Sequence, residues 1–200
     1  MPKRVDHEER RRRIAEALWR IASTRGLDGV SLRDVAAEAG ISLGQLQHYF
    51  ATKDEMLVFS LDHISELATA RVRDRILALA HTPSAREIIR ETIAEMLPRD
   101  ANSRTGLLVQ LAYFVRAVHD ERMARHAQQG VPALAGFFAD QIRAAIERGE
   151  VAADRDPHTE AMLLIAMADG LSGYALMDVC SVGEALRLAD AQLERLFSGR

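Results

Sequence analysis

The fold is decided by residues 31–49, which read Ser-Leu-Arg-Asp-Val-Ala-Ala-Glu-Ala-Gly-Ile-Ser-Leu-Gly-Gln-Leu-Gln-His-Tyr. This stretch predicts two short helices joined by a tight turn. Each helix begins with a serine that can cap it, because Ser31 starts a Ser-x-x-acid pattern with Asp34 and Ser42 starts a capping box with Gln45. Gly40 lies where the first helix must end, since a residue without Cβ enters the left-handed conformation at little cost.

Apolar residues recur at helical spacing in both segments, which predicts that each helix buries one side. These residues are Leu32, Val35, Ala36 and Ala39 in the first helix and Leu43, Leu46 and Phe50 in the second, with Ile41 returning to the core between them. The second helix then turns Gln45, His48 and Tyr49 outward, with Gln47 near the edge. This is the layout of a DNA-binding helix-turn-helix, although helix–glycine–helix corners also occur in many all-α proteins.

Three further features favour DNA binding. A basic run, residues 10–13, starts the preceding helix, and Lys53 follows the second helix, where a phosphate could meet its charge at the next helix start. The outward side chains are hydrogen-bonding and aromatic types instead of the Glu and Lys that usually cover a solvated face. Residues 1–53 carry 10 Lys and Arg against 7 Asp and Glu, whereas residues 54–200 carry 16 against 22. A basic head on an acidic body suits a protein that touches DNA at one end.

Residues 41–57 read Ile-Ser-Leu-Gly-Gln-Leu-Gln-His-Tyr-Phe-Ala-Thr-Lys-Asp-Glu-Met-Leu and resemble the end of the N-terminal domain of TetR-type transcriptional regulators. The matching elements are His-Tyr-Phe, a Lys three residues later, and acidic residues leading to Leu57. Upstream, Ile14-x-x-x-Leu18 and the break at Gly26 match as well. The resemblance covers roughly residues 8–60 and is only architectural beyond them.

The whole chain is predicted to be all-α. Its 200 residues are 48% hydrophobic, enough for a proper core, and its Val and Ile never alternate as in strands. With the resemblance, this predicts an N-terminal three-helix helix-turn-helix DNA-binding domain over residues 1–53 and a C-terminal helical effector-binding and dimerisation domain over residues 54–200. Helices are expected at about 6–25, 53–80, 85–97, 105–118, 119–129, 133–148, 157–179 and 182–197. Residues 102–104 are expected to be a connector, and Gly130-Val131-Pro132 a break.

Several residues are candidates for direct contact with DNA. Gln45 and Gln47 are candidates for base reading, because a Gln amide can donate and accept to adenine N6 and N7 together. Gly44 allows close approach of the backbone, and His48 could meet a base or a phosphate. The resemblance implies phosphate contacts at Ser31, Ser42, Tyr49 and Lys53, which set register without reading sequence. The basic run at residues 10–13 could reach the DNA backbone or remain a solvated helix start.

A homodimer on a palindromic operator is expected, because one small domain covers too few base pairs to find a site in a genome. The last two helices are the expected interface. Residues 162–167 and 171–177 carry apolar side chains on more faces of the helix than the internal core of one subunit needs, and Gly170 and Gly173 allow a second helix to approach closely. The resemblance implies the same four-helix bundle.

The resemblance also implies an unknown small-molecule effector whose binding excludes DNA. Candidate effector-binding residues are Tyr113, Phe114, Arg116, Phe137 and Met162. Such apolar residues are more often plain core, and an Arg at the position of Arg116 is more often part of a surface salt bridge. The predicted helix over residues 53–80 is long enough to belong to both domains, so we expect it to carry the coupling.

Other functions find less support. The chain has no Gly-x-Ser-x-Gly, Walker or Gly-x-Gly-x-x-Gly motif, so no catalytic residue and no cofactor are expected. His119 and His126 lie about 10.5 Å apart along a helix, too far to share a metal, and none is expected. The alternatives are an adaptor of the same fold that acts through protein contacts, and a transcriptional activator, which nothing in the sequence separates from a repressor. One cysteine, no signal peptide and no apolar run long enough for a membrane indicate a cytoplasmic protein.

Overall fold

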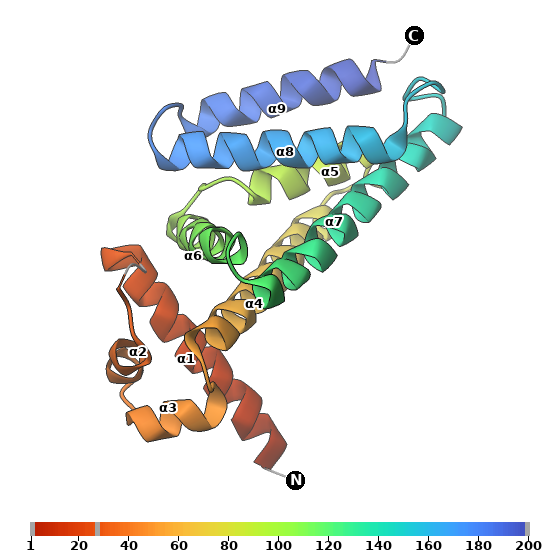
Figure 1. Cartoon of the computed structure of the whole chain (residues 1–200). Coiled ribbons are helices and arrows are strands. Elements are labelled where there is room, and N and C mark those ends of the chain that lie inside the picture. Colours follow the sequence, from red (N-terminus) through yellow and green to blue (C-terminus); the bar gives the residue numbers. More distant parts are fainter. Residues whose placement is uncertain (1–2, 27–28, 199–200) are drawn as a thin grey trace. The chain divides into compact units, whose positions relative to one another are not determined.

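The structure, a computed structural model, describes residues 3–26 and 29–198, with side chains described from residue 7 onward. All regular elements in these ranges are α-helices (Figure 1), which confirms the predicted fold class. They are α1 (Lys3–Arg25), α2 (Leu32–Glu38), α3 (Leu43–Tyr49), α4 (Lys53–Leu77), α5 (Ala85–Glu95), α6 (Ala101–Ala117), α7 (Glu121–Glu147), α8 (Pro157–Leu176) and α9 (Val182–Phe197).

Helices α2 and α3 each begin with the capping box expected from the sequence. The Ser31 Oγ accepts the Asp34 N–H at 3.3 Å, and the Asp34 carboxylate accepts the Ser31 N–H at 2.8 Å. Ser42 and Gln45 make the equivalent pair at 3.2 and 3.0 Å. Gly40 has a φ of +68°, the left-handed conformation that ends α2. These local signals place α3 at a fixed angle to α2.

The three N-terminal helices enclose one small core. Its buried side chains are Ile14, Leu18, Ile21 and Ala22 on α1, Val35 and Ala36 on α2, Leu46 on α3 and Phe50 just after it. Of the apolar stripes predicted for α2 and α3, Leu32, Ala39 and Leu43 are only half-buried. Ile41 is only half-buried, so the expectation that it returns to the core is met in part.

Two sequence expectations were wrong. Helix α7 runs without interruption through Pro132, which removes a single backbone donor, and buried Ala135 and Phe138 follow it within one helix. Residues 102–104 are not a connector but the first turn of α6. Asp100 and Ser103 cap that turn reciprocally, through the Asp100 N–H to the Ser103 Oγ at 3.0 Å and the Ser103 N–H to the Asp100 carboxylate at 2.8 Å. In the usual capping box the serine comes first and the acid follows three residues later, whereas here Asp100 comes first and Ser103 follows.

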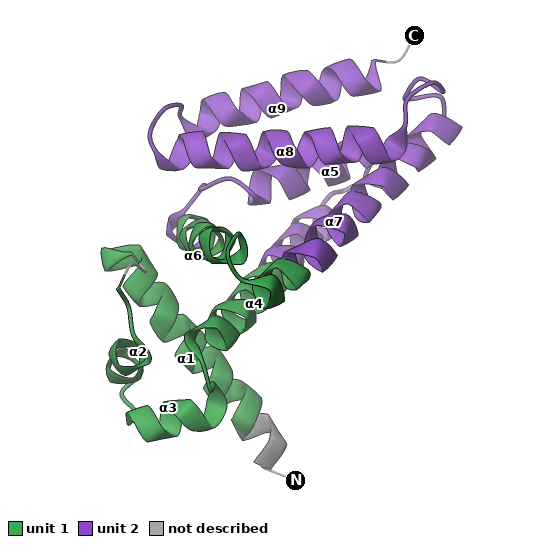
Figure 2. Ribbon diagram, viewed as in Figure 1, with its two compact units in different colours: residues 1–67, 104–126 green, residues 68–103, 127–200 purple. Residues whose placement is uncertain are grey.

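The chain divides into two compact units (Figure 2). Unit 1 comprises residues 1–67 and 104–126, and unit 2 comprises residues 68–103 and 127–200. Helices α4 and α7 therefore each contribute to both units. The boundary expected at residue 53 separates DNA binding from effector binding and dimerisation, and it stays a prediction.

Ion pairs join three helices within unit 2. On α4, Arg71 and Arg75 both donate to the Glu95 carboxylate of α5, at 2.6 and 2.8 Å. One turn earlier on α5, Arg90 binds Asp190 of α9 at 2.6 Å. The Glu95 side chain is only 9% exposed, so its pairs are better shielded from solvent than an ordinary surface pair.

The start of α5 should make stability depend on acidity. Hydrogen bonds from the Ser84 backbone and hydroxyl, with help from His81, lower the pKa of Glu87 from 4.5 to about 2. Since the folded pKa lies below the ordinary value, the stabilisation is full above about pH 4.5 and is lost as pH falls toward 2. We expect Glu87→Gln to be less stable than wild type in urea unfolding at neutral pH, and the difference to shrink on acidification. A difference that stayed constant down to about pH 2 would contradict this assignment.

Candidate nucleic-acid interface

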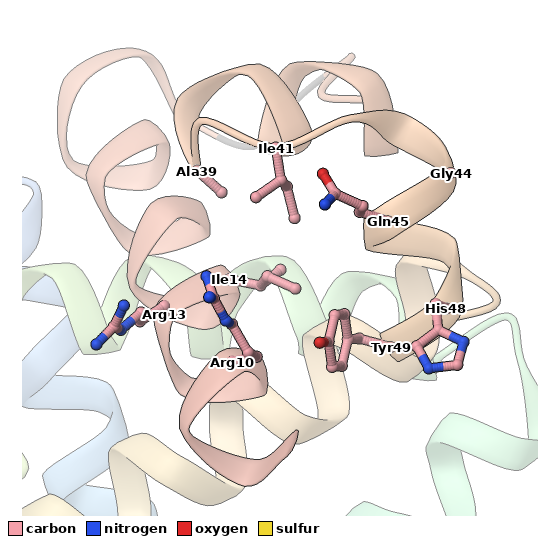
Figure 3. A pocket seen from close by; sticks show the side chains of 9 residues that line it. All are labelled: Arg10, Arg13, Ile14, Ala39, Ile41, Gly44, Gln45, His48 and Tyr49. Atoms are coloured by element: carbon pink, nitrogen blue, oxygen red, sulfur yellow. The ribbon is translucent and has the colours of Figure 1, made fainter. Parts of the chain in front are cut away.

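A hollow of about 490 Å³ lies between α1 and α3 (Figure 3). Its lining comes from three segments: Arg10, Arg13 and Ile14 on α1, Ala39 and Ile41 at the turn, and Gly44, Gln45, His48 and Tyr49 on α3. Four of the eight predicted DNA-binding residues are thus brought together, beside two arginines of the basic run. The hollow combines cationic, amide and aromatic side chains, a composition suited to a nucleic-acid surface.

Gln45 lines the hollow, and its side chain is already engaged within the protein. The Gln45 Oε1 accepts the Ser42 N–H at 3.0 Å, and Figure 3 shows the amide pointing inward beside Ile41. Gln47 does not line the hollow and is exposed. The sequence places Gln45 outward and Gln47 near the edge. Both are exposed in the structure, but only Gln45 lines the hollow and is hydrogen-bonded to Ser42.

Gly44 is exposed, and nothing in the described chain requires a glycine there. A Cβ built on Gly44 would meet no atom within 4 Å, and its φ is not in the left-handed region. Glycine inside a helix costs roughly 0.5–1 kcal/mol relative to alanine. The packing of the described residues therefore does not explain the glycine, and its role in DNA contact stays a prediction.

The start of α1 packs against the end of α3 through aromatic rings. The His7 ring lies 4.9 Å from Tyr49 and 6.2 Å from His48, measured between centroids, and His48 and Tyr49 are 5.4 Å apart. Tyr49, which the sequence places outward, is half-buried by this packing. His7 is a surface residue that the sequence did not single out, because only the fold brings it to α3.

The predicted phosphate contacts differ in the donors they can offer. Ser31 donates its hydroxyl proton to Asp34 at 2.6 Å, and these Ser31 hydrogen bonds lower the pKa of the Asp34 carboxyl. In Ser42, the hydroxyl oxygen accepts the Gln45 N–H and the hydroxyl proton is left for another acceptor. Lys53 is half-buried at the first residue of α4. Ser42 is therefore better placed than Ser31 to donate to a phosphate.

Arg11 departs from the expectation for the basic run. Its guanidinium lies over two rings, 4.6 Å from the Phe50 centroid and 4.3 Å from the Phe59 centroid, and donates to Glu55 at 3.3 Å. This residue packs inward and ties α1 to α4, whereas Arg10 and Arg13 line the hollow. Sequence alone gave no signal for the difference, since all four arginines of the run are consecutive.

The predicted effector residues are divided between the two units. In unit 1, Tyr113 is buried and its hydroxyl donates to the Met123 carbonyl, Phe114 is half-buried, and Arg116 forms an ion pair with Asp54 at the start of α4. In unit 2, Phe137 and Met162 are exposed. Arg116 thus forms an ion pair, which was the alternative for this residue. The effector role of all five candidate residues stays a prediction.

None of the helices in residues 3–26 and 29–198 combines the length and apolar character needed to cross a membrane.

Models of known families match most of the chain. Residues 14–58 match the model described as bacterial regulatory proteins of the tetR family, and residues 85–198 match that of the BetI-type transcriptional repressor C-terminal domain. The HTH-type transcriptional regulator PksA of Bacillus subtilis is 35% identical over 92% of this chain and 87% of its own length. The regulator BetI of Paraburkholderia phymatum is 30% identical over 99% and 98%.

Solved structures give the same result. A TetR-family transcriptional regulator from Rhodococcus sp. superposes with a TM-score of 0.83 at 26% identity, covering 94% of this chain and 99% of that one. A transcriptional regulator from Saccharomonospora viridis, solved in complex with choline, has a TM-score of 0.80 at 27% identity, with coverage of 94% and 96%.

Substitution of Gly44 should separate folding from DNA contact. We expect Gly44→Ala to raise the free energy of unfolding by roughly 0.5–1 kcal/mol, because alanine favours the helix and meets no neighbour. The same methyl group should weaken DNA binding by keeping the backbone away from the double helix. Urea unfolding and DNA titration of the same preparation measure the two effects. A variant that is more stable and binds DNA as well as wild type would show that Gly44 does not lie at the contact.

Proposed function

This chain belongs to the TetR family of transcriptional regulators, whose members bind DNA, and from that premise we propose that it is a cytoplasmic repressor that a small molecule releases from a palindromic operator. Its relatives are transcriptional regulators, which is a non-enzymatic role. The observation that carries the proposal is the hollow between α1 and α3, where Arg10 and Arg13 stand beside the bare backbone of Gly44 and the polar side chains of α3.

Within this proposal, α3 enters the major groove and the residues around it bind phosphate. Gly44 permits the close approach, the candidates for base contact are Gln45, Gln47 and His48, and the predicted phosphate contacts are Ser31, Ser42, Tyr49 and Lys53. Arg10 and Arg13 supply charge to the backbone from α1. Both arginines already have partners within the protein, so DNA has to compete with those partners. For Arg13 the partner is Glu9, at 3.0 Å.

A homodimer through α8 and α9 completes the proposal, since regulators of this family bind DNA as dimers. Helix α8 presents Leu163 (56% exposed) and Tyr174 (52%) to solvent on the side opposite its buried stripe, and the exposed Met177 (65%) follows directly after the helix. Gly170 lies among them, and a Cβ built there would meet no atom within 4 Å. An exposed apolar stripe with a glycine at its centre suits a second helix packed close against it.

The effector is proposed to bind among the C-terminal helices, with Tyr113, Phe114, Arg116, Phe137 and Met162 as candidate contacts. Choline is the first compound to test, because the Saccharomonospora viridis regulator was solved with it and residues 85–198 match a BetI-type domain. Release requires that the effector favours a conformation that does not bind DNA, with a coupling free energy of about 1–3 kcal/mol. Helix α4 is the proposed link, because it contributes residues to both units.

Selection of fragmented genomic DNA by the purified protein tests the function. We expect an enriched palindrome that a Tyr49→Ala, Lys53→Ala double variant no longer selects, and binding that weakens steeply with salt through release of counterions. Addition of choline or of compounds processed by neighbouring gene products should then release the DNA. Enrichment of no sequence at low salt would support the adaptor alternative. A site within an activated promoter would identify an activator instead.

The dimer makes a separate prediction at Gly170. We expect Gly170→Leu to leave each protomer folded, because a side chain there meets nothing in its own chain, and to shift the protein to monomers by blocking the second helix. Operator affinity should fall as dimerisation is lost, since a single protomer contacts only half of the palindrome. Sedimentation measures the oligomeric state, and the circular dichroism of the helices measures whether each protomer is folded. A matched control is Gly130→Leu on α7, where a Cβ also meets no neighbour and the oligomeric state should not change. A dimeric Gly170→Leu protein would place the interface elsewhere.

A further inference from the structure

We infer that Gln47 is the glutamine that reads a base pair, and that Gln45 is a positioning residue that fixes the start of α3. The inference rests on the DNA-binding function and goes beyond it by assigning sequence discrimination to one of two side chains of the same type. It follows from what each amide already binds within the protein.

The Gln45 amide is occupied by the helix cap. Its Oε1 accepts the Ser42 N–H at 3.0 Å, while the Gln45 N–H donates to the Ser42 Oγ at 3.2 Å. Reading adenine with two hydrogen bonds requires the same Oε1 to accept from the base N6. A bidentate contact would have to turn both the oxygen and the nitrogen of the Gln45 amide onto the base edge, whereas the cap holds the oxygen toward the Ser42 N–H at the helix start.

The Gln47 amide has no competing partner. Its side chain is exposed, and no hydrogen bond or ion pair engages it in the described part of the chain. Both its oxygen and its nitrogen are consequently available to a base edge, as a bidentate contact requires. Nothing has to be broken before it binds.

The helical positions of the two residues lead to the same assignment. At about 100° per residue, Gly44 and Gln47 lie roughly 60° apart on neighbouring turns of α3, whereas Gln45 and Gln47 are about 160° apart. Gln45 is on the side with Tyr49 and points into the hollow toward α1 (Figure 3). Gly44 borders the hollow as well, but by helical position it lies nearer to Gln47 than to Gln45. The position without a Cβ and the exposed Gln47 amide are therefore neighbours on α3.

The test uses the full-length protein and the operator that it selects. Each base pair of the operator is replaced in turn, and relative affinities are measured for wild type, Gln47→Ala, Gln45→Glu and Gln45→Ala. The Gln45→Glu variant is the matched control, because a glutamate completes the capping box with the Ser42 N–H as glutamine does. Thermal unfolding of the same proteins reports on the cap.

Gln47→Ala is expected to lose discrimination at one base pair of each half-site, by about 5- to 150-fold, with the remaining preferences intact. Gln45→Glu should keep the whole preference profile while its affinity falls by one common factor, since a carboxylate repels DNA regardless of sequence. Gln45→Ala should lower thermal stability, and Gln45→Glu should restore it.

Loss of one base preference in Gln45→Glu, with an unchanged profile in Gln47→Ala, would overturn the assignment. An unchanged profile in both variants would overturn it as well, because discrimination would then belong to other residues. Failure of the wild type to select any sequence would instead remove the operator-binding function on which the inference rests.

Discussion

The Arg11 guanidinium holds α1 against the junction of α3 and α4, because it lies over the rings of Phe50 and Phe59 and donates to Glu55. Phe50 directly follows α3 and Phe59 lies on α4, so this one side chain of α1 fixes the joint between the two helices. The charge is stabilised by the ring faces and by the carboxylate together. Every proposed DNA contact on α3 depends on that joint, because the side chains of a helix reach the bases only when the helix lies in the groove at the right angle.

Helix α4 is held by different partners along its length. In unit 1, Asp54 pairs with Arg116 of α6, and Asp62 pairs with His126 of α7 at 3.2 Å. Burial raises the pKa of the Asp62 carboxyl, and the charge of His126 opposes that rise. In unit 2, Glu95 of α5 receives two arginines from the far end of α4. A ligand that changed the packing of α6 or α7 would therefore act on α4 through charged groups with defined partners, which gives the proposed coupling a physical route.

Two glycines carry much of the functional argument, since each costs helix stability without a reason inside its own chain. Gly44 and Gly170 both lie in helices with space for a side chain around them. Gly106 is the contrast: a Cβ there would approach the Ile64 side chain to 3.1 Å, so that side chain would have to move by a few tenths of an ångström. Open space alone does not mark a contact, since Gly130 has it too. Gly44 and Gly170 are singled out by their neighbours, the polar side chains of α3 and the exposed apolar stripe of α8.

The sequence by itself determined the local elements and the surface that they form. Capping by Ser31 and Ser42, the left-handed turn at Gly40 and the apolar stripes act over one or two turns, so neighbouring residues suffice to predict them. Only the tertiary structure decided which members of that surface are available. It turned Arg11 inward, brought His7 against Tyr49, and carried α7 through Pro132. Those outcomes depend on competition between partners that are distant in sequence or equal in type, and residue type alone does not resolve that competition.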